Sequence, residues 1–320
     1  RLRCDWSSDV CSSDLIYFLV ALFTFYRGAY EAPETLDLKF EEITTPISAH
    51  TVFTEQPEIR TGITVIDGAH DNDFDPNEIV SLQSSLANRG ITVDFMGVPT
   101  GFGGFRRTTS TDRLALLESK LRQAGSFVVI SPREPYSIEE RALVRRFVDK
   151  GGRLLLISDP SRTQQINILA EEFGLSFQPG FLYNQVDFDL NHRNIFVQDF
   201  FADPVTEGLS QVAFYAASAI RSGGPALAYT DGNTFSNLVE GIEPFYPLAK
   251  SRQGNVLAVG DITFMVPPQN SILDNSRLIA NIAEFLASSG RGFELADFPY
   301  FFDGTRSEEH TSELQSHLNL

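Results

Sequence analysis

Cysteine, tryptophan and positive charge are all scarce in this chain. Its 320 residues include two Cys, one Trp and 25 Lys and Arg against 42 Asp and Glu, for a net charge of −17. Such an acidic chain lacks the basic surface that binds a phosphate backbone, so we expect no nucleic-acid partner. Two cysteines cannot form a disulfide-rich scaffold or a Cys-based zinc site. The 42% of hydrophobic residues is nevertheless typical of a globular protein.

The two ends of the chain do not have the character of natural protein sequence. The run RSEEHTSELQS at 306–316 is one translation of a common sequencing-library adapter. The reverse complement of that adapter, read one base in, encodes DWSSDVCSSDL at 5–15. We therefore interpret residues 1–15 and 306–320 as adapter read-through and expect their removal to leave stability unchanged. Both Cys and the Trp lie in the first segment, so we expect the biological chain to lack cysteine and to have other termini.

An apolar run follows the first of these segments. Residues 16–26 (IYFLVALFTFY) are apolar or aromatic apart from Thr24, and Arg27 and Tyr30 suit a membrane–water interface. The run is too short to cross a bilayer by itself, but it begins where the adapter stops. We interpret residues 16–30 as part of a transmembrane anchor, with the end of a signal peptide or a buried helix as alternatives. Residues 31–60 are polar and contain three prolines, which indicates a linker.

Strand-like and helix-like segments alternate after this linker. Short apolar runs predict strands at 63–66, 91–96, 127–130, 153–157 and 256–259, and longer segments predict helices at 76–88, 112–124, 137–149, 164–173 and 276–287. This alternation indicates an α/β fold with an open, mostly parallel sheet and helices on both faces, as in flavodoxin- and amidotransferase-like proteins. We assign residues 61–290 to this domain and 291–305 to the start of a truncated C-terminal segment.

The stretch before the last predicted core strand has a different amino-acid composition. Residues 181–260 are rich in Gly, Pro, Asn and aromatic side chains, with short strand-like runs at 195–198 and 226–229. We predict an irregular β-rich insertion there. If its aromatic residues were exposed together, they would mark a protein contact.

Polar side chains follow several of the predicted strands. Ligands of open α/β sheets bind beyond the carboxyl ends of the strands. We therefore expect a ligand site, but no catalytic residue, metal or cofactor, among the residues at these ends. They are Asp67, His70, Asn72, Asp73, Ser131, Ser158, Asp159 and Asp261.

The acidic stretch after the first strand superficially matches a calcium loop. Aspartates stand at 71, 73 and 75, but Pro76 occupies the position that needs Gly, and Leu82 the position of the bidentate Glu. We therefore predict a turn in which Asp75 caps the next helix. In the same way, a capping box of Ser137 and Glu140 is predicted to open the helix at 137–149. His70 either orients this turn by hydrogen bonding or acts as a general base. The Gly-rich run 101–107, with two arginines, is either a mobile loop or an anion cradle.

The fourth strand ends in Ser158, where a hydrolase of this fold could carry its nucleophile. The strained turn of such a site needs small neighbours, whereas Pro160 stands where Gly is usual. A serine nucleophile also needs a base, and His70 is the histidine whose predicted strand end is nearest. We keep a hydrolase that uses the Ser158 turn or the His70 acidic cluster as an alternative function.

Several motifs together resemble a known family. They are DGAHxNxF from Asp67, SxEExxxVxxFVxxGGRLLL from Ser137, DPVTxGL from Asp203, and GNVLAVGDxxF from Gly254, with Asn281 in the closing helix. Over residues 60–288 the chain resembles the domain of unknown function numbered four-three-five-zero and the extracytoplasmic domain of gliding-motility-type ABC-transport auxiliary proteins. The resemblance implies an amidotransferase-like fold without the catalytic Cys, and binding or scaffolding rather than catalysis. Asp203 departs from the His that the family often has before Pro.

From these observations we expect a membrane-anchored, non-catalytic accessory or binding domain of an ABC-type export or transport system. Its partners would be the membrane and transporter subunits, and its folded domain would be extracytoplasmic. The hydrolase described above and a structural protein-assembly module are the alternatives.

Overall fold

The structure, a computed structural model, describes residues 9–25, 54–100, 103–241 and 244–290. The chain divides into two units, Arg1–Thr45 and Pro46–Leu320. In the first unit the described part is a single helix, α1 (Asp9–Phe25), which contains the beginning of the predicted anchor. Residues 26–30 of that prediction lie outside the described ranges. Within those ranges no helix is both long and apolar enough to cross a membrane.

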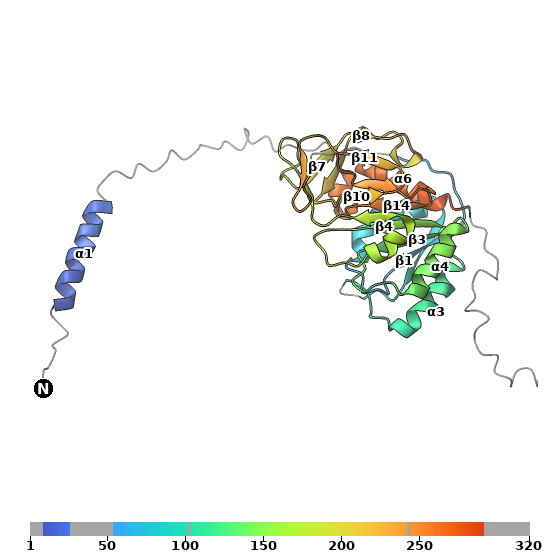
Figure 1. Ribbon diagram of the computed structural model, residues 1–320, viewed down its shortest axis with the longest axis horizontal. Coiled ribbons are helices and arrows are strands. Elements are labelled where there is room, and N and C mark those ends of the chain that lie inside the picture. Colours follow the sequence, from blue (N-terminus) through green and yellow to red (C-terminus); the bar gives the residue numbers. More distant parts are fainter. Residues whose placement is uncertain (1–8, 26–53, 101–102, 242–243, 291–320) are drawn as a thin grey trace, which may run out of the picture. The chain divides into compact units, whose positions relative to one another are not determined.

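An eight-stranded sheet organises the second unit (Figure 1). Its order is β2, β1, β3, β4, β14, β13, β11, β8. The first five pair in parallel, and the last three join antiparallel. The strands are β1 (Gly62–Asp67), β2 (Ile91–Met96), β3 (Ser126–Ile130), β4 (Arg153–Ile157), β8 (Asp199–Phe200), β11 (Ala226–Tyr229), β13 (Leu248–Lys250) and β14 (Val256–Val259). This confirms the predicted α/β class and the mostly parallel sheet.

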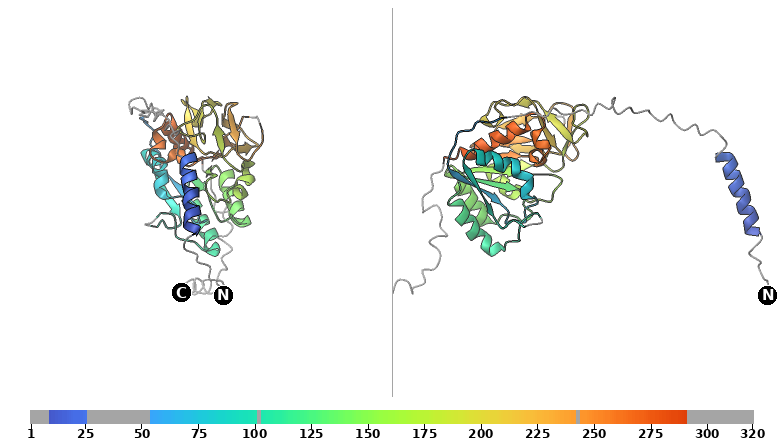
Figure 2. Two further views of the ribbon diagram at one scale, coloured as in Figure 1. Left: turned by 90° about the vertical axis from the view of Figure 1, so that its left-hand side faces the viewer. Right: turned by 180° about the vertical axis from the view of Figure 1, so that it is seen from behind.

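Helices cover both faces of the sheet (Figure 2). One apolar layer joins α2 (Val80–Asn88) and α6 (Asn275–Ala287) to strand residues such as Ile66 and Leu155. The opposite layer joins α3 (Ser110–Leu121) and α4 (Ile138–Asp149) to residues such as Val65 and Leu156. Neighbouring strand residues thus point to opposite layers, as the pleat of a strand requires. Burial on both faces explains why the central strands β3, β4 and β14 are almost entirely apolar.

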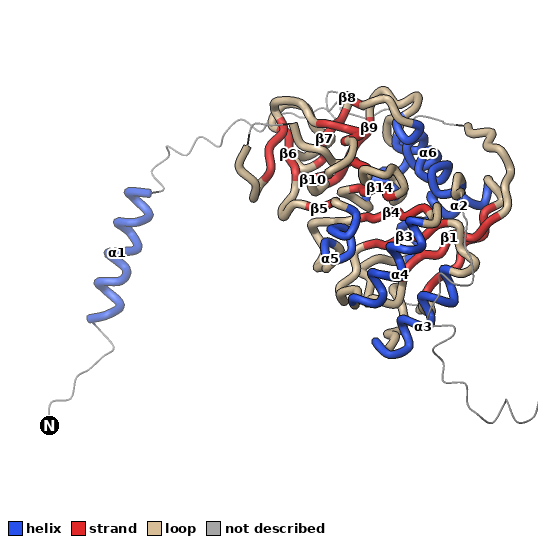
Figure 3. The backbone as a smooth tube through the Cα atoms, turned by 45° about the vertical axis from the view of Figure 1, so that its right-hand side comes forward, coloured by secondary structure: helices blue, strands red, loops and turns tan. Residues whose placement is uncertain are grey.

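The predicted insertion before β14 consists mainly of short strands and loops, as expected (Figure 3). It holds three two-stranded ribbons: β5 (Leu175–Phe177) with β10 (Ile220–Ser222), β6 (Leu182–Asn184) with β12 (Thr234–Ser236), and β7 (Asn194–Val197) with β9 (Val212–Tyr215). Its aromatic side chains mostly pack within the unit. Phe201 is the one exposed Phe among the described residues of 181–250.

Two helix starts follow their predicted caps, and one helix is shorter than predicted. Asp75 accepts from the backbone N–H of Asn77 at the start of η2 (Pro76–Ile79), a 3₁₀ turn that leads into α2. Ser137 and Glu140 form the predicted capping box of α4. The helix expected at 164–173 is only α5 (Asn167–Ala170), followed by the 3₁₀ turn η3 (Glu171–Phe173). Before α5 the backbone N–H of Gln165 donates to the carbonyl of Pro132 on another part of the chain.

Candidate functional site

The carboxyl end of β1 carries a buried polar network centred on Asp67. The Asp67 carboxylate accepts hydrogen bonds from the Tyr136 hydroxyl at 2.6 Å, from the Asn72 amide at 3.1 Å and from the backbone N–H of Ala69 at 3.0 Å. Asn72 also donates to the carbonyl of Ile130, at the end of β3. Asp67 is fully buried. The network therefore joins the turn after β1 to the end of the next strand in the sheet.

His70 completes this network with a second carboxylate. Its Nδ1 lies 3.0 Å from Oδ2 of Asp67, and its Nε2 lies 3.4 Å from Oε1 of Glu140 on α4. The ring stacks on Tyr136 with centroids 3.7 Å apart. Burial by itself lowers the pKa of His70, but the charges and hydrogen bonds of Asp67 and Glu140 raise it to about 9. The imidazole is therefore protonated at neutral pH, and it is not poised as a general base.

The same interactions act on the carboxylates. Burial raises the pKa of Asp67, but the charge of His70 and the hydrogen bonds that Asp67 accepts hold it below its ordinary value. The pKa of Glu140 is likewise lowered, against its burial, chiefly by His70. Arg113 on α3 lies 3.5 Å from Glu140 and also pairs with Glu134. Alternating charges thus cross the edge of the sheet, each beside an opposite charge, which is the arrangement that buried ions require.

A second polar group lies at the ends of β4 and β14. The hydroxyl of Ser158 accepts a hydrogen bond of 2.6 Å from the Gln164 side-chain amide, and Ser218 lies 3.5 Å away. Ser158 is fully buried. An amide N–H cannot remove a proton from a hydroxyl, and the ring nitrogens of His70 face Asp67 and Glu140 instead. No hydrogen bond links Ser158 to His70 or to His192 anywhere in the described ranges.

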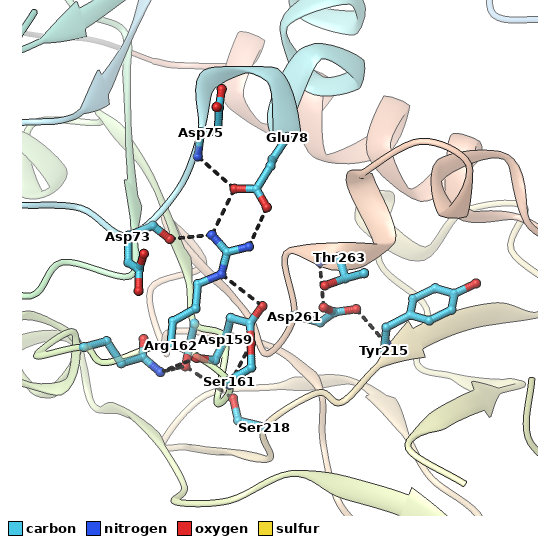
Figure 4. Close-up of polar contacts among 12 residues, drawn as sticks. Asp73, Asp75, Glu78, Asp159, Ser161, Arg162, Tyr215, Ser218, Asp261 and Thr263 are labelled. Atoms are coloured by element: carbon cyan, nitrogen blue, oxygen red, sulfur yellow. Dashed lines mark hydrogen bonds and ion pairs between the residues drawn. The ribbon is translucent and has the colours of Figure 1, made fainter. Parts of the chain in front are cut away.

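Asp261 fixes the turn after β14. Its carboxylate accepts hydrogen bonds from the backbone N–H groups of Thr263 at 2.7 Å and Tyr215 at 2.8 Å (Figure 4). The backbone N–H of Phe264 donates a third, at 3.2 Å. Complete burial, together with the nearby charge of Asp159, raises the pKa of Asp261 to about 7 despite these hydrogen bonds. Asp261 thus joins β9 of the insertion to the core strand β14.

Arg162 connects several acidic residues at the carboxyl edge of the sheet (Figure 4). Its guanidinium binds both oxygens of Glu78 and the carbonyl of Asp73, and its Nε lies 3.4 Å from Asp159. Asp159 is almost completely buried and accepts from the N–H and hydroxyl of Ser161 at 2.8 and 2.6 Å. Arg162 therefore ties the loop after β4 to the turn after β1.

The side chains of two predicted site residues take no part in these networks. Asp73 is half-buried and pairs with Arg133 at 2.8 Å. Ser131 is fully buried at the end of β3, with a left-handed φ of 37°, and its hydroxyl has no hydrogen-bond partner in the part of the chain that the structure describes. Of the Gly-rich run, residues 101–102 lie outside the described ranges, and Arg107 pairs with Glu134 at 2.9 Å. The structure thus brings the predicted residues to one edge of the sheet, as expected, but most of their side chains are buried there.

The DPVT motif also has a structural role. Asp203 caps the 3₁₀ turn η4 (Pro204–Thr206) and accepts a 2.6 Å hydrogen bond from the buried Lys250 on β13. Asn281 on α6 donates to the carbonyls of Val205 and Glu207 at 3.0 and 2.9 Å. These contacts attach the insertion to α6 and to the antiparallel half of the sheet.

Sequence reasoning missed the residues that connect the predicted ones. Tyr136, Arg113, Arg162 and Gln164 belong to no motif that marks them. Glu140 was recognised as half of a capping box, and one of its oxygens does serve the cap, while the other faces His70. A carboxylate on the buried side of an amphipathic helix was the available signal, because such a group needs a partner.

Comparisons with known proteins give a likeness of fold. No protein-family model and no curated protein matches the chain. The mmIFT52 N-terminal domain is similar in structure with a TM-score of 0.54 and 15% identity, over 72% of this chain and 100% of that one. A putative ThuA-like protein from Parabacteroides merdae matches with a TM-score of 0.43 and 13% identity, over 74% of this chain and 94% of that one. At 15% identity the first likeness concerns the fold alone.

Proposed function

We propose that this chain is a membrane-anchored, non-catalytic accessory or binding domain of an ABC-type export or transport system, with its folded domain outside the cytoplasm. The observation that carries the non-catalytic part is the use made of the carboxyl-edge residues. Asp67, His70 and Ser158 are fully buried and bound to other side chains. Groups that hold the edge together in this way are not available to a substrate.

The hydrolase alternative depends on one contact. A serine nucleophile needs a base within hydrogen-bond reach of its hydroxyl. Ser158 has Gln164 in that position, and His70 is held between two carboxylates. This pairing supports a structural role for both residues over a catalytic one.

The transport part of the proposal rests on the resemblance and on the apolar N-terminal run. The order of motifs such as GNVLAVGD from Gly254 resembles that of the auxiliary-protein family and supports this part of the proposal, although DPVT has Asp203 where that family often has His. In α1 the side chains of Ile16, Phe18 and Phe23 are exposed and apolar, which supports contact with a membrane rather than with water.

Co-purification tests the transport proposal. The intact gene, expressed from its own chromosomal neighbourhood with an affinity tag, is extracted in mild detergent and compared with a version that lacks residues 16–30. We expect ABC permease and ATPase subunits to elute with the first at fixed stoichiometry, and the second to leave the membrane fraction. A full chain that elutes alone, beside a genome in which no transporter genes adjoin it, would contradict the proposal.

A further inference from the structure

The eight-stranded sheet has two edge strands that differ in length. β8 contains only two residues, whereas β2 contains six and pairs along its whole length with β1. Nothing in the described ranges pairs with the other edge of β2. A long strand with an unpaired edge is a template for another strand, and a very short edge strand is one way in which proteins avoid such pairing. β2 is therefore the edge that can accept a further strand.

The hydrogen bonds of β2 define which of its backbone groups are unpaired. The carbonyl of Met96 accepts from the backbone N–H of Gly68 at 2.8 Å, so the backbone groups of Met96 face β1. Backbone groups alternate between the two edges along a strand. The N–H and C=O groups of Ile91, Val93 and Phe95 therefore face away from β1. Since each residue has one donor and one acceptor, this edge presents a regular row of both.

The side chains of β2 divide between the two faces of the sheet. Those of the three outward-facing residues belong to the layer that contains α2. Thr92 and Asp94 lie on the other face, where Lys120 of α3 pairs with Asp94 at 2.7 Å. Asp94 is the one charged residue of the strand. A charge on an edge strand normally discourages pairing, but here Lys120 compensates it.

The helix beside β2 carries no charge. A groove of about 560 Å³ runs between α2 and β2, and its α2 side is formed by Val80, Gln83, Ser84 and Ala87. No residue of α2 is charged, whereas α3, α4 and α6 each contain at least two charged residues. In a chain with a net charge of −17, most surfaces of two copies repel each other. The uncharged surface of α2 and β2 avoids this repulsion, so it suits contact with a second copy of the chain.

The backbone and the charges select one register for two copies related by a two-fold axis, which pairs the strands antiparallel. Outward-facing residues must lie opposite one another to exchange hydrogen bonds. An axis at Asp94 would place its carboxylate opposite that of the second copy, which is unfavourable. An axis at Thr92 would leave Phe95 without a partner in β2. An axis at Val93 places Val93 opposite its copy and Ile91 opposite Phe95 of the second copy, and it brings the Thr92 hydroxyl opposite the Asp94 carboxylate.

We propose that the chain forms a two-fold symmetric dimer in which the β2 strands of two copies pair antiparallel, centred on Val93. The sheet of each copy thereby continues into that of the other. Apolar side chains pair on the α2 side, where the two grooves meet and lose water, and Thr92 donates to Asp94 of the second copy on the other side. This inference goes beyond the transport role proposed above and does not depend on it.

Sedimentation equilibrium of the full chain in mild detergent tests the proposal. We expect the wild type to sediment with twice the mass of one chain. Thr92→Glu places a second carboxylate opposite Asp94 at two symmetric positions, so its dimer should be about tenfold weaker. Thr92→Lys is the matched control, because it changes the same exposed residue but brings an opposite charge to Asp94; its dimer should be at least as tight as that of the wild type.

Three results of this experiment would overturn the proposal. They are a wild type that stays monomeric up to about 100 µM, a dimer that Thr92→Glu leaves unchanged, and equal weakening by Thr92→Glu and Thr92→Lys. The first would leave the edge to a different partner, the second would place the dimer contact elsewhere, such as at α1, and the third would show that Asp94 of the second copy is not opposite Thr92.

Disulfide cross-linking tests the register. Cys4 and Cys11 are first replaced by serine, and Val93→Cys and Thr92→Cys are then oxidised separately. Residues in a hydrogen-bonded antiparallel pair have Cα atoms about 5.5 Å apart, which a disulfide can span. We expect Val93→Cys to form a covalent dimer, whereas Thr92→Cys should not, because its copy is displaced along the strand. No cross-link through Val93→Cys, or equal cross-linking of both variants, would overturn the pairing centred on Val93.

Discussion

The imidazole of His70 lies 3.0 Å from the carboxylate of Asp67, and both side chains are completely buried where β1 ends. In this fold β1 and β3 are neighbours in the sheet, and the strand order reverses between them. Related α/β proteins bind ligands at such a reversal. Here an ion pair and its hydrogen-bond partners fill the position.

Removing one member of this pair should strongly destabilise the domain. Asp67→Asn leaves the buried His70 charge without its nearest counter-charge, so we expect a loss of about 3–5 kcal/mol in the free energy of unfolding. Asp94→Asn is the matched control, because Asp94 pairs with Lys120 on the surface, and such pairs contribute about 0–1 kcal/mol. Urea denaturation measures both. Similar losses in the two variants would show that the Asp67 network does not hold the edge.

The same pair predicts how stability changes on the alkaline side. Because the folded pKa of His70 is about 9 and its ordinary value is 6.5, His70 contributes stability that is fully present below 6.5 and is lost as the pH rises through about 9. His70→Gln should be less stable at pH 6.5 and should lack this alkaline decline. Unfolding free energies measured for both proteins at several pH values across this window check the sign. A wild type that gains stability relative to His70→Gln as the pH rises would contradict it.

Lowering the pH should destabilise the fold by protonating the carboxylates of Asp67 and Glu140. The pKa values of Asp67 and Glu140 are lowered in the folded state. The ionised carboxylates therefore contribute to the free energy of unfolding at pH values above their ordinary pKa, and this contribution is lost as the pH falls through the folded pKa. We expect Glu140→Gln to reduce the dependence of stability on pH in the acid range. An acid titration of the unfolding free energy that is the same in the variant and the wild type would show that Glu140 is not coupled to this network.

The centre of the sheet should not tolerate a cavity. Leu155 lies in β4, between β3 and β14, and is fully buried in the layer that includes α6. Leu155→Ala is expected to cost about 2–5 kcal/mol. Ile138→Ala, at an exposed position of α4, should cost less than about 0.5 kcal/mol. An unchanged denaturation midpoint for Leu155→Ala would mean that β4 is not the central strand.

The contacts by which Arg162 joins the loop after β4 to Glu78 should contribute moderately to the free energy of unfolding. Its hydrogen bonds to Glu78 are charge-assisted and partly shielded from water, so Arg162→Ala should lose about 1.5–3 kcal/mol. Arg145→Ala is the control, since Arg145 is exposed and reaches Glu172 at 3.4 Å. Thermal melts compare the two. Equal shifts would indicate that the bridge is no stronger than a surface ion pair.

Local sequence patterns predicted the core strands well and their polar partners poorly. The bounds predicted for β2, β4, β11 and β14 agree with those observed, because short, mostly apolar runs between turn residues leave little alternative. The Asp75 and Ser137 caps were also predictable, since each acts on its own chain within three residues.

The partners could not be predicted because they come from distant parts of the chain. Tyr136 follows Asp67 by 69 residues, and Arg162 follows Glu78 by 84. Position at a strand end correctly brought His70 and Ser158 to one edge of the sheet, but burial and pairing there depend on side chains from α4 and from the insertion. The pairing of the insertion strands is likewise tertiary and leaves no periodic signal.

Hydrolytic turnover tests the central claim most directly. The full chain and its Ser158→Ala variant are assayed on a panel of esters and amides, with circular dichroism to confirm that both are folded. Because Ser158 is buried and bound to Gln164, we predict that both proteins remain at the rate of buffer alone. Turnover by the wild type well above buffer, abolished in a folded Ser158→Ala protein, would show that the carboxyl edge is an active site and that the non-catalytic account is wrong.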